Sequence, residues 1–302
     1  MDLYARYAEF IEGFLKIEQS LTVVFDCSNG TTGLVLRKVK SKREKVKGIF
    51  INDRPDGNFL AHGPDPLRPD ALRDLIRAVQ ENKADCGVIF DADGDRVFFV
   101  DDKGKPLTAD NAAILIGETE QGPVALDVRM GYGAREWFAS HNRAVVDSRV
   151  GHYFIKKLMR EKNISYAAEL SGHYYFSDFF YCDSGIFAAI RFLNSVARLK
   201  QKGMKLSEWI TAQPHYYQSR EINFEVTDKE AMMKKVYDTY KDEARITSTL
   251  DGIKMEFGEG DKAWWFNVRP SNTENLLRLN LEAKDKKLFN AKLKEIKALI
   301  QG

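Results

Sequence analysis

The alternation of apolar runs and polar turns in the first two thirds of the chain predicts strands and helices in turn. Short apolar runs indicate buried strands, and apolar residues at helical spacing indicate amphipathic helices. We expect strands at 21–26, 48–51, 88–90, 97–100, 123–127, 144–147 and 165–169. We expect helices at 4–16, 70–82, 109–119, 133–140, 151–162 and 183–200. Strands that alternate with helices favour largely parallel sheets covered by helices on both faces.

The pattern changes beyond Pro214. Residues 221–226 alternate like a half-exposed strand, and further strands are expected at 254–257, 263–268 and 276–281, with helices at 228–243 and 286–300. Such a group favours a small α+β domain with an antiparallel sheet. We therefore predict an α/β protein. Two α/β/α three-layer domains with mixed, mainly parallel sheets span 1–104 and 105–212, and an α+β domain spans 213–302.

Composition excludes several classes of partner. The chain has 302 residues, of which 44% are hydrophobic and 30% charged, which is typical of a globular protein of two or three domains. Its net charge of +2 gives no general attraction to nucleic acid or to a membrane surface. No apolar run approaches the ~20 residues of a membrane span, and the three cysteines lie far apart, as reduced thiols do. We expect a cytoplasmic protein that binds neither nucleic acid nor membrane.

The loop between the expected strands at 88–90 and 97–100 carries the clearest chemistry. Asp91, Asp93 and Asp95 stand at every second position, so their carboxylates can converge on one point. Converging anions repel one another unless a cation neutralises them, and oxygen ligands suit Mg²⁺. Arg96 follows with a fork of donors that suits a phosphate. The loop, called the Asp loop below, predicts a magnesium site beside a phosphoryl group.

The Asp loop has three alternative interpretations. A solvated hairpin turn needs one or two such residues rather than alternating acids. An EF-hand requires glycine at the position of Arg96 and a helix after it, whereas a strand follows here. The stretch also resembles the nucleophile loop of haloacid-dehalogenase-like phosphatases, which has Thr or Val at the position of Asp95.

Two later loops also follow strands. Residues 169–173, called the sugar loop, offer a carboxylate, a hydroxyl and an imidazole, which suit the vicinal hydroxyls of a sugar. Residues 269–274, called the phosphate loop, gather a guanidinium, hydroxyls and an amide, which suit a phosphate dianion. An earlier turn, 27–33, is interpreted equally well as a phosphate-binding βα turn or as a turn that serves the fold alone.

Together and in this order, the loops resemble those of the α-D-phosphohexomutase superfamily, and most of all its phosphomannomutase/phosphoglucomutase branch. That family's loops read D-G-D-G-D-R, G-E-M-S-G-H and R-x-S-N-T or R-P-S-G-T-E-P. The resemblance runs from about Tyr4 to the C-terminus and includes the turns at 56–59, 150–152 and 183–186. It implies an isomerase of carbohydrate metabolism that interconverts the 1- and 6-phosphates of glucose or mannose, with a sugar 1,6-bisphosphate as activator.

The resemblance also implies roles for individual residues. It makes Asp91, Asp93 and Asp95 the ligands of Mg²⁺ and brings Arg96 to the transferring phosphoryl group. Glu169 and Ser171 would hold the O3 and O4 hydroxyls of the sugar. His173 would carry a proton, which suits a side chain with an ordinary pKa of about 6.5. The sugar-phosphate site would be lined by Gly151, His152 and Arg129, and the non-reacting phosphate held by Arg269, Ser271, Asn272 and Thr273.

The sequence also departs from the family pattern. Members carry four domains, and the first holds a phosphoserine in a T-A-S-H-N-P loop, whereas the chain resembles the second to fourth. We therefore expect a separate chain to supply the phosphoserine domain, or else a non-catalytic or regulatory protein that binds sugar phosphates. Residues 139–142 spell Ala-Ser-His-Asn, which we interpret as coincidence because they end a helix. Ala92 replaces a glycine of the Asp loop and would be strained if its φ were positive.

Overall fold

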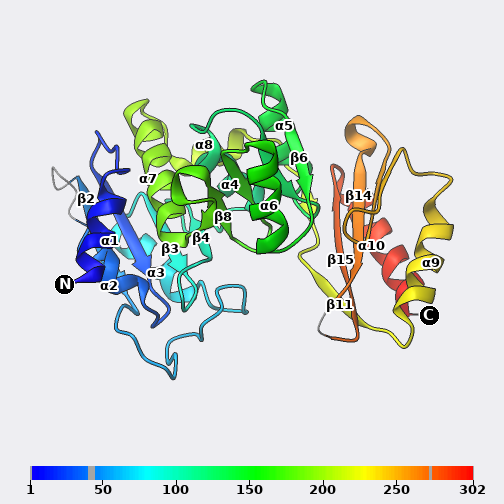
Figure 1. The fold of residues 1–302 in the computed structure, drawn as a ribbon, viewed down its shortest axis with the longest axis horizontal. Coiled ribbons are helices and arrows are strands. Elements are labelled where there is room, and N and C mark those ends of the chain that lie inside the picture. Colours follow the sequence, from blue (N-terminus) through cyan, green and yellow to red (C-terminus); the bar gives the residue numbers. More distant parts are fainter. Residues whose placement is uncertain (1, 40–44, 272–273, 302) are drawn as a thin grey trace.

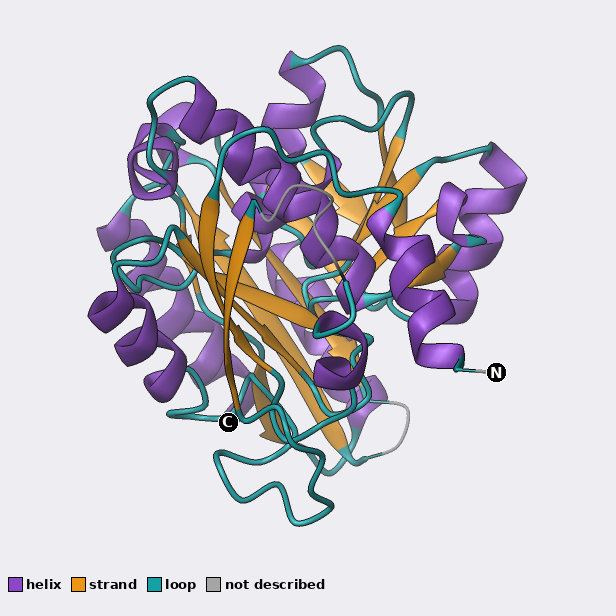
Figure 2. Cartoon of the chain, turned by 90° about the vertical axis from the view of Figure 1, so that its left-hand side faces the viewer, coloured by secondary structure: helices purple, strands orange, loops and turns teal. Residues whose placement is uncertain are grey.

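The protein is described here by a computed structural model that covers residues 2–39, 45–271 and 274–301. Within these residues the strands form three sheets, which follow one another along the molecule from the N-terminal end to the C-terminal end (Figure 1). Helices flank the strands in the perpendicular view of Figure 2. Among the residues covered, no helix is both long enough and apolar enough to cross a membrane.

The first sheet has the strand order β2-β1-β3-β4. Its first three strands are parallel, and β4 pairs antiparallel with β3. The strands are β1 (Leu21–Asp26), β2 (Val46–Ile51), β3 (Cys86–Phe90) and β4 (Val97–Val100). The helices of this part are α1 (Leu3–Glu12), α2 (Thr32–Leu36) and α3 (Arg73–Asn82). The β3–β4 hairpin therefore presents the Asp loop at the carboxyl end of a parallel strand.

The second sheet repeats this arrangement with the order β6-β5-β7-β8-β9, in which β8 is again antiparallel to its neighbour. Its strands are β5 (Val124–Asp127), β6 (Val145–Ser148), β7 (Tyr166–Ala168), β8 (Tyr174–Phe176) and β9 (Cys182–Asp183). The helices that follow or flank it are α4 (Ala109–Gly117), α5 (Tyr132–Ser140), α6 (His152–Lys162), α7 (Gly185–Gln201) and α8 (Leu206–Ala212). The sugar loop joins β7 to β8, in the same place as the Asp loop in the first sheet.

One apolar core joins the first two sheets. The same cluster of buried side chains includes residues of β1, β3 and β4 from the first sheet, residues of β5 and β7 from the second, and most of α7. The ring of Phe192 on α7 stacks on that of Phe99 on β4 with centroids 3.9 Å apart. Since apolar surfaces buried this way are costly to separate, these two sheets form one unit.

The third sheet is antiparallel and packs its helices on one face. Its strands are β10 (Tyr217–Gln218), β11 (Ile222–Glu225), β12 (Ile246–Ser248), β13 (Ile253–Phe257), β14 (Trp264–Pro270) and β15 (Leu276–Ala283). The helices α9 (Lys229–Tyr240) and α10 (Lys286–Gln301) lie on the side away from the rest of the molecule (Figure 1). They enclose a separate apolar core with alternate residues of the strands.

The opposite face of the third sheet is polar and also buried. Lys254, Asn267, Asn280 and Glu282 are nearly inaccessible. Contacts with the second sheet's part are polar as well: for example, the Val150 amide donates to Asp251 Oδ2 at 2.8 Å. Among the described residues, the buried polar atoms on this face that lack a hydrogen-bond partner include Lys254 Nζ, Asn267 Oδ1 and Asn280 Oδ1. The third sheet is thus joined to the others by charge and hydrogen bonds rather than by a common apolar core.

The predicted fold class is confirmed, whereas several short elements were not foreseen. The prediction omits β8, β9, β10, β12 and α8, and it extends the first helix to residue 16 although α1 ends at Glu12. The missed strands have two or three residues each, which is too short for a periodic pattern. They form because neighbouring strands offer partners, so they are products of the tertiary fold.

Two buried carboxylates meet where the third sheet contacts α5. The amide of Gln218 donates to Asp110 Oδ2 and to Glu282 Oε2, both at 2.5 Å. Glu282 also accepts from the Tyr132 amide at 2.7 Å and from Trp265 Nε1 at 3.0 Å. Burial raises the pKa of Glu282 to about 7 and also raises that of Asp110. The Glu282 carboxyl of the folded protein therefore binds a proton as the pH falls below about 7.

This proton makes stability depend on pH in a defined direction. The ordinary pKa of a glutamate is 4.5, so between 4.5 and about 7 the folded protein binds more protons than the unfolded chain. Stability must then fall as pH rises through that window, by at most about 1.4 kcal/mol per pH unit. Glu282→Gln removes the titrating group, so its stability relative to the wild type should increase from about pH 5 to about pH 7.

Urea unfolding at a series of pH values measures this difference. Glu259→Gln is the matched control, because Glu259 lies exposed on the same part of the chain. The control should follow the wild type at every pH. Parallel stability curves for Glu282→Gln and the wild type would show that Glu282 does not hold the proton.

Candidate active site

The Asp loop is built around the buried side chain of Asp91. Its Oδ1 accepts hydrogen bonds from the amides of Gly94 at 3.0 Å and Arg96 at 3.1 Å, and its Oδ2 accepts from Arg96 Nε at 2.7 Å. The turn requires a positive φ at Gly94 (79°), but not at Ala92. Alanine therefore replaces the family's glycine at position 92 without backbone strain.

The three aspartates converge as predicted from their spacing. Asp91, Asp93 and Asp95 each offer a carboxylate oxygen, and these oxygens lie within 4.8 Å of one another. Burial raises the pKa of Asp91 to about 6, whereas the hydrogen bond with His173 lowers that of Asp95. The donor set consists of oxygens alone, and it ranges from the buried Asp91 to the exposed Asp93. It fits a hard cation such as Mg²⁺ that keeps part of its water shell.

A second group in the described part of the chain could also hold a metal. Asp95, His152, His173 and Asp183 offer ligand atoms that lie within 4.8 Å of one another. Its imidazoles are already engaged: His152 Nδ1 lies 2.9 Å from Asp183 Oδ2. Imidazole also suits transition metals better than Mg²⁺. The all-oxygen set of the Asp loop is therefore the better magnesium site.

Arg96 is held from two sides. Besides Asp91, its guanidinium contacts Asp65 Oδ1 at 3.2 Å. Asp65 belongs to the proline-rich segment 63–69, and this segment also supports the loop because the Ala92 amide donates to the Pro64 carbonyl at 3.2 Å. No local pattern connects Asp65 with Arg96, because the two residues lie 31 positions apart and Asp65 stands in an irregular segment.

The earlier turn at 27–33 packs behind the Asp loop. Ser28 Oγ donates to the Phe90 carbonyl at 2.5 Å, and the Thr31 amide donates to the Ala92 carbonyl at 3.2 Å. A Cβ atom at Gly30 would overlap the Ala92 backbone, so this position requires glycine. These contacts favour the interpretation of the turn as a support for the fold.

Glu169 in the sugar loop is 1% exposed, and both of its carboxylate oxygens have partners. Oε1 accepts from the Gly151 amide at 2.9 Å, and Oε2 accepts from the Tyr175 hydroxyl at 2.6 Å. The Leu170 amide donates to Asp127 Oδ2 at 2.9 Å. Contact between Glu169 and a sugar therefore requires the loop to adjust or a carboxylate oxygen to accept a second hydrogen bond.

The sugar loop and the Asp loop are joined backbone to backbone. Arg96 and His173 form an antiparallel bridge, and the Val97 amide donates to the Gly172 carbonyl at 3.1 Å. Their side chains meet too, since His173 Nε2 lies 3.5 Å from Asp95 Oδ1. The other ring nitrogen of His173 lies 2.9 Å from Ser171 Oγ. The predicted metal ligands, the predicted proton carrier and one predicted sugar ligand thus share one small region.

The remaining predicted residues connect the second and third sheets. Arg129 pairs with Asp127 at 2.8 Å and with Glu221 at 3.4 Å, and Glu221 in turn lies 3.1 Å from Arg269. Ser271 in the phosphate loop is buried, and its Oγ accepts from Arg278 at 3.3 Å. Asn272 and Thr273, the other predicted phosphate ligands, lie outside the described residues.

Ser140, in the stretch Ala139–Asn142, lies away from these loops. It ends α5, and its Oγ donates to the Trp137 carbonyl at 2.8 Å. The neighbouring Arg143 donates to the carbonyls of Gly117 and Gly122, which precede β5. The site loops lie at the opposite, carboxyl ends of the strands, so this geometry agrees with a coincidental match to the phosphoserine motif.

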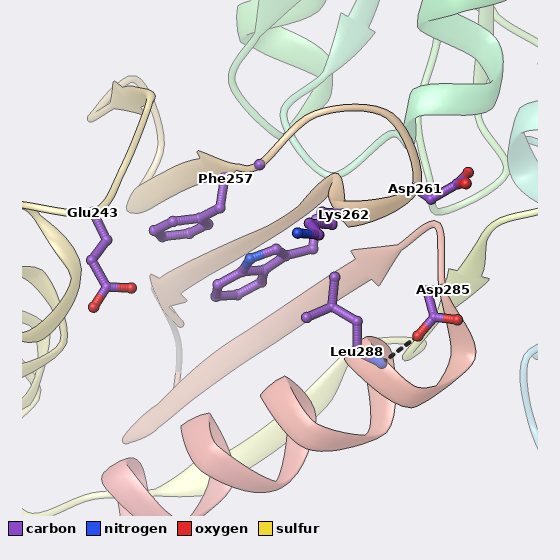
Figure 3. A pocket seen from close by; sticks show the side chains of 8 residues that line it. Glu243, Phe257, Asp261, Lys262, Asp285 and Leu288 are labelled. Carbon is purple, nitrogen blue, oxygen red and sulfur yellow. Dashed lines mark hydrogen bonds between the residues drawn. The ribbon is translucent and has the colours of Figure 1, made fainter.

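A separate hollow of about 580 Å³ lies in the third sheet's part (Figure 3). It is lined by residues that include Glu243, Phe257, Asp261 and Trp264. Trp264 begins β14, whereas Arg269 lies near the end of that strand, about 17 Å further on. The two aromatic rings are buried and stack on each other at 4.1 Å, so they belong to the core. The hollow is distinct from the loops described above.

Comparison with known families accounts for nearly the whole chain. Three family models match: "Phosphoglucomutase/phosphomannomutase, alpha/beta/alpha domain II" over residues 5–104, "alpha/beta/alpha domain III" over 107–217 and "C-terminal domain" over 221–299. The matches follow the chain in the order expected from the loops. The exact limits of the domains, which the sequence places after residues 104 and 212, stay a prediction.

Individual relatives agree with this assignment. The chain is 39% identical to a phosphomannomutase of Methanocaldococcus jannaschii over 92% of its length, and 35% identical to one of Vibrio cholerae over 93%. It spans 61% and 62% of the length of these two relatives. The crystal structure of a phosphoglucomutase/phosphomannomutase family protein from Burkholderia thailandensis superposes with a TM-score of 0.86 at 26% identity, covering 99% of this chain and 64% of that one. The chain therefore belongs to the phosphoglucomutase/phosphomannomutase family of the α-D-phosphohexomutase superfamily.

Proposed function

We propose that the protein is a phosphohexomutase that binds the phosphates of glucose or mannose with Mg²⁺ and interconverts their 1- and 6-phosphates. The observation that carries the proposal is the junction of the Asp loop with the sugar loop through Arg96, Val97, Gly172 and His173. This junction places converging carboxylates, a guanidinium and an imidazole beside one another. Such a set serves phosphoryl transfer, in which positioning and charge stabilisation do most of the work.

Each group has a part in this proposal. Arg96 contacts the transferring phosphoryl group, and Asp91 and Asp65 hold its guanidinium in place. Bound Mg²⁺, held by Asp91, Asp93 and Asp95, supplies positive charge that offsets the charge of the phosphoryl group. The grip of Arg269 and Ser271 on the non-reacting phosphate, with Asn272 and Thr273 from the same loop, allows the sugar to bind in two flipped orientations.

His173 is the proposed proton carrier. One ring nitrogen lies 3.5 Å from Asp95 Oδ1, and the other lies near Ser171 Oγ and Glu169 Oε2, at 2.9 Å and 3.4 Å. Oxygen atoms thus lie beside both ring nitrogens and orient the ring, so it can accept a proton from a sugar hydroxyl and return it. Arg129 and His152 line the same region, and Gly151 donates its amide to Glu169.

The reaction also requires a residue that carries the phosphoryl group between its two halves. The resemblance places it in a T-A-S-H-N-P loop of the family's first domain, and the matched family models cover domains II to IV. A domain with that loop must meet this site, whichever polypeptide holds it. A second candidate function, sugar-phosphate binding without turnover, is favoured by a set of binding loops that needs no serine.

The phosphate loop gives the first test. Arg269→Ala removes a charge-assisted hydrogen bond worth ~1.5–3 kcal/mol, so the affinity for glucose 1-phosphate should fall about tenfold or more. Calorimetry with glucose and mannose 1-phosphates measures the change. Arg245→Ala, which removes an exposed arginine of the same sheet, is the control and should bind like the wild type. Equal binding by the wild type and Arg269→Ala would refute the assignment of the phosphate loop.

The Asp loop gives the second test. Asp93→Asn preserves the shape of an exposed side chain and removes one of three charges, so Mg²⁺ should bind more weakly, by about tenfold. Titration of the protein with Mg²⁺ measures the effect. Asp261→Asn, a change of an exposed acid in the third sheet's part, should leave the affinity unchanged. An Asp93→Asn protein that binds Mg²⁺ as tightly as the wild type would place the ion elsewhere.

The third test concerns turnover. Residues 1–302 alone should not convert glucose 1-phosphate into glucose 6-phosphate, even with the 1,6-bisphosphate, because they match family domains II to IV and the proposed phosphoryl carrier belongs to the first domain. Conversion should appear when a first-domain polypeptide with a phosphorylated T-A-S-H-N-P loop is added, and it should be lost again with Asp93→Asn. Phosphorus NMR follows both phosphates directly. Turnover by these residues alone that Ser140→Ala abolishes would mean that the Ala139–Asn142 stretch is functional.

A further inference from the structure

The carboxylate of Glu221 lies among three guanidinium groups. Its Oε2 lies 3.4 Å from Arg129 and 3.1 Å from Arg269, and its Oε1 lies 3.2 Å from Arg278. Glu221 stands in the segment that leads from β10 to β11, while Arg129 follows β5 of the second sheet. Arg269 and Arg278 face each other across β14 and β15. One carboxylate thus holds together arginines from two sheets.

The charges of this cluster are unevenly balanced. Arg129 also pairs with the buried Asp127, and Arg278 also pairs with the exposed Glu274 at 3.3 Å. Within the residues that the structure describes, Glu221 is the only acid paired with Arg269. Arg269 is 7% exposed, so its charge depends on that carboxylate. The Nε atoms of Arg269 and Arg278 are buried and have no hydrogen-bond partner among the described residues. The cluster therefore has unused donors beside the carboxylate that it already holds.

We propose that Glu221 is a built-in counter-ion of the phosphate loop, and that a phosphate group displaces its carboxylate from Arg269 and Arg278. The inference rests on the proposed function, because it concerns how the same loop receives the phosphate of the sugar. It adds Arg278 to the phosphate-binding residues. Arg278 already donates to Ser271 Oγ at 3.3 Å, so its guanidinium is fixed on the phosphate loop before any ligand arrives.

The exchange is chemically reasonable on three grounds. A phosphate dianion carries more charge than a carboxylate and offers more acceptor oxygens, so it can use the unpartnered Nε donors. The side chain of Glu221 is 24% exposed and can turn towards water once displaced. Like charges repel, so a carboxylate that stayed beside the phosphate would weaken binding. Glu221 is therefore a positioning residue that keeps the arginines in place at the expense of phosphate affinity.

Glu221→Gln tests this role with inorganic phosphate as the probe. The variant keeps the shape and one acceptor but removes the negative charge, so phosphate should bind about tenfold more tightly than to the wild type at equal ionic strength. A residue with only a structural role would give weaker or unchanged binding. Glu225→Gln changes an exposed glutamate of β11 and is the matched control, which should bind like the wild type.

The result separates this inference from the proposed function. If Arg269→Ala loses phosphate binding while Glu221→Gln binds as the wild type does or more weakly, the counter-ion role is overturned and the phosphate loop stands. If Arg269→Ala and the wild type bind phosphate equally, the phosphate loop itself is wrongly assigned. A crystal structure of the wild type with bound phosphate gives an answer that does not depend on the variant's folding. The Glu221 carboxylate should have left Arg269, and phosphate bound beside an intact pair would overturn the proposal.

Discussion

The packing of α7 between the first two sheets is the constraint on which the site depends. The helix is buried along most of its length and stacks Phe192 on Phe99. Its first residue, Gly185, donates its amide to the Gly94 carbonyl at 2.9 Å, and a Cβ atom at Gly185 would come within 3 Å of backbone oxygens of Gly94 and Arg96. The core thus presses a helix terminus directly against the Asp loop, so core packing and loop geometry cannot vary independently.

The third sheet is held to the rest of the molecule by polar contacts rather than by apolar packing. It has its own apolar core with α9 and α10, and it meets the second sheet's part through ion pairs and hydrogen bonds. Two groups of these contacts surround Glu221 and Glu282. Glu221 pairs with three arginines, and the raised pKa of Glu282 lets this carboxyl bind a proton as the pH falls below about 7. Both contacts are therefore sensitive to the solution in a way that the core around α7 is not.

The sequence was sufficient for the fold class and for the location of the loops, because both depend on local patterns. Period-two and helical spacing revealed the long elements, and acids at alternate positions revealed the convergence of Asp91, Asp93 and Asp95. The tertiary contacts of these residues cannot be inferred from local patterns along the chain. Glu221 and Arg278 flank or belong to strands whose polar positions predict an exposed face. Only the tertiary arrangement shows that the second sheet's part partly covers that face and brings these charges into one network.

The polar interface has a thermodynamic consequence. Separation of the third sheet from the rest would hydrate Lys254, Asn267, Asn280 and their neighbours, some of whose polar atoms have no hydrogen-bond partner among the described residues. Exposure of apolar surface raises the heat capacity and exposure of polar surface lowers it, so such an opening has a small net heat-capacity change. The enthalpy of opening therefore varies little with temperature, so a plot of ln K against 1/T for the balance between closed and open forms should be nearly straight. Added salt favours the open form, because ions screen the charges once the sheets have separated.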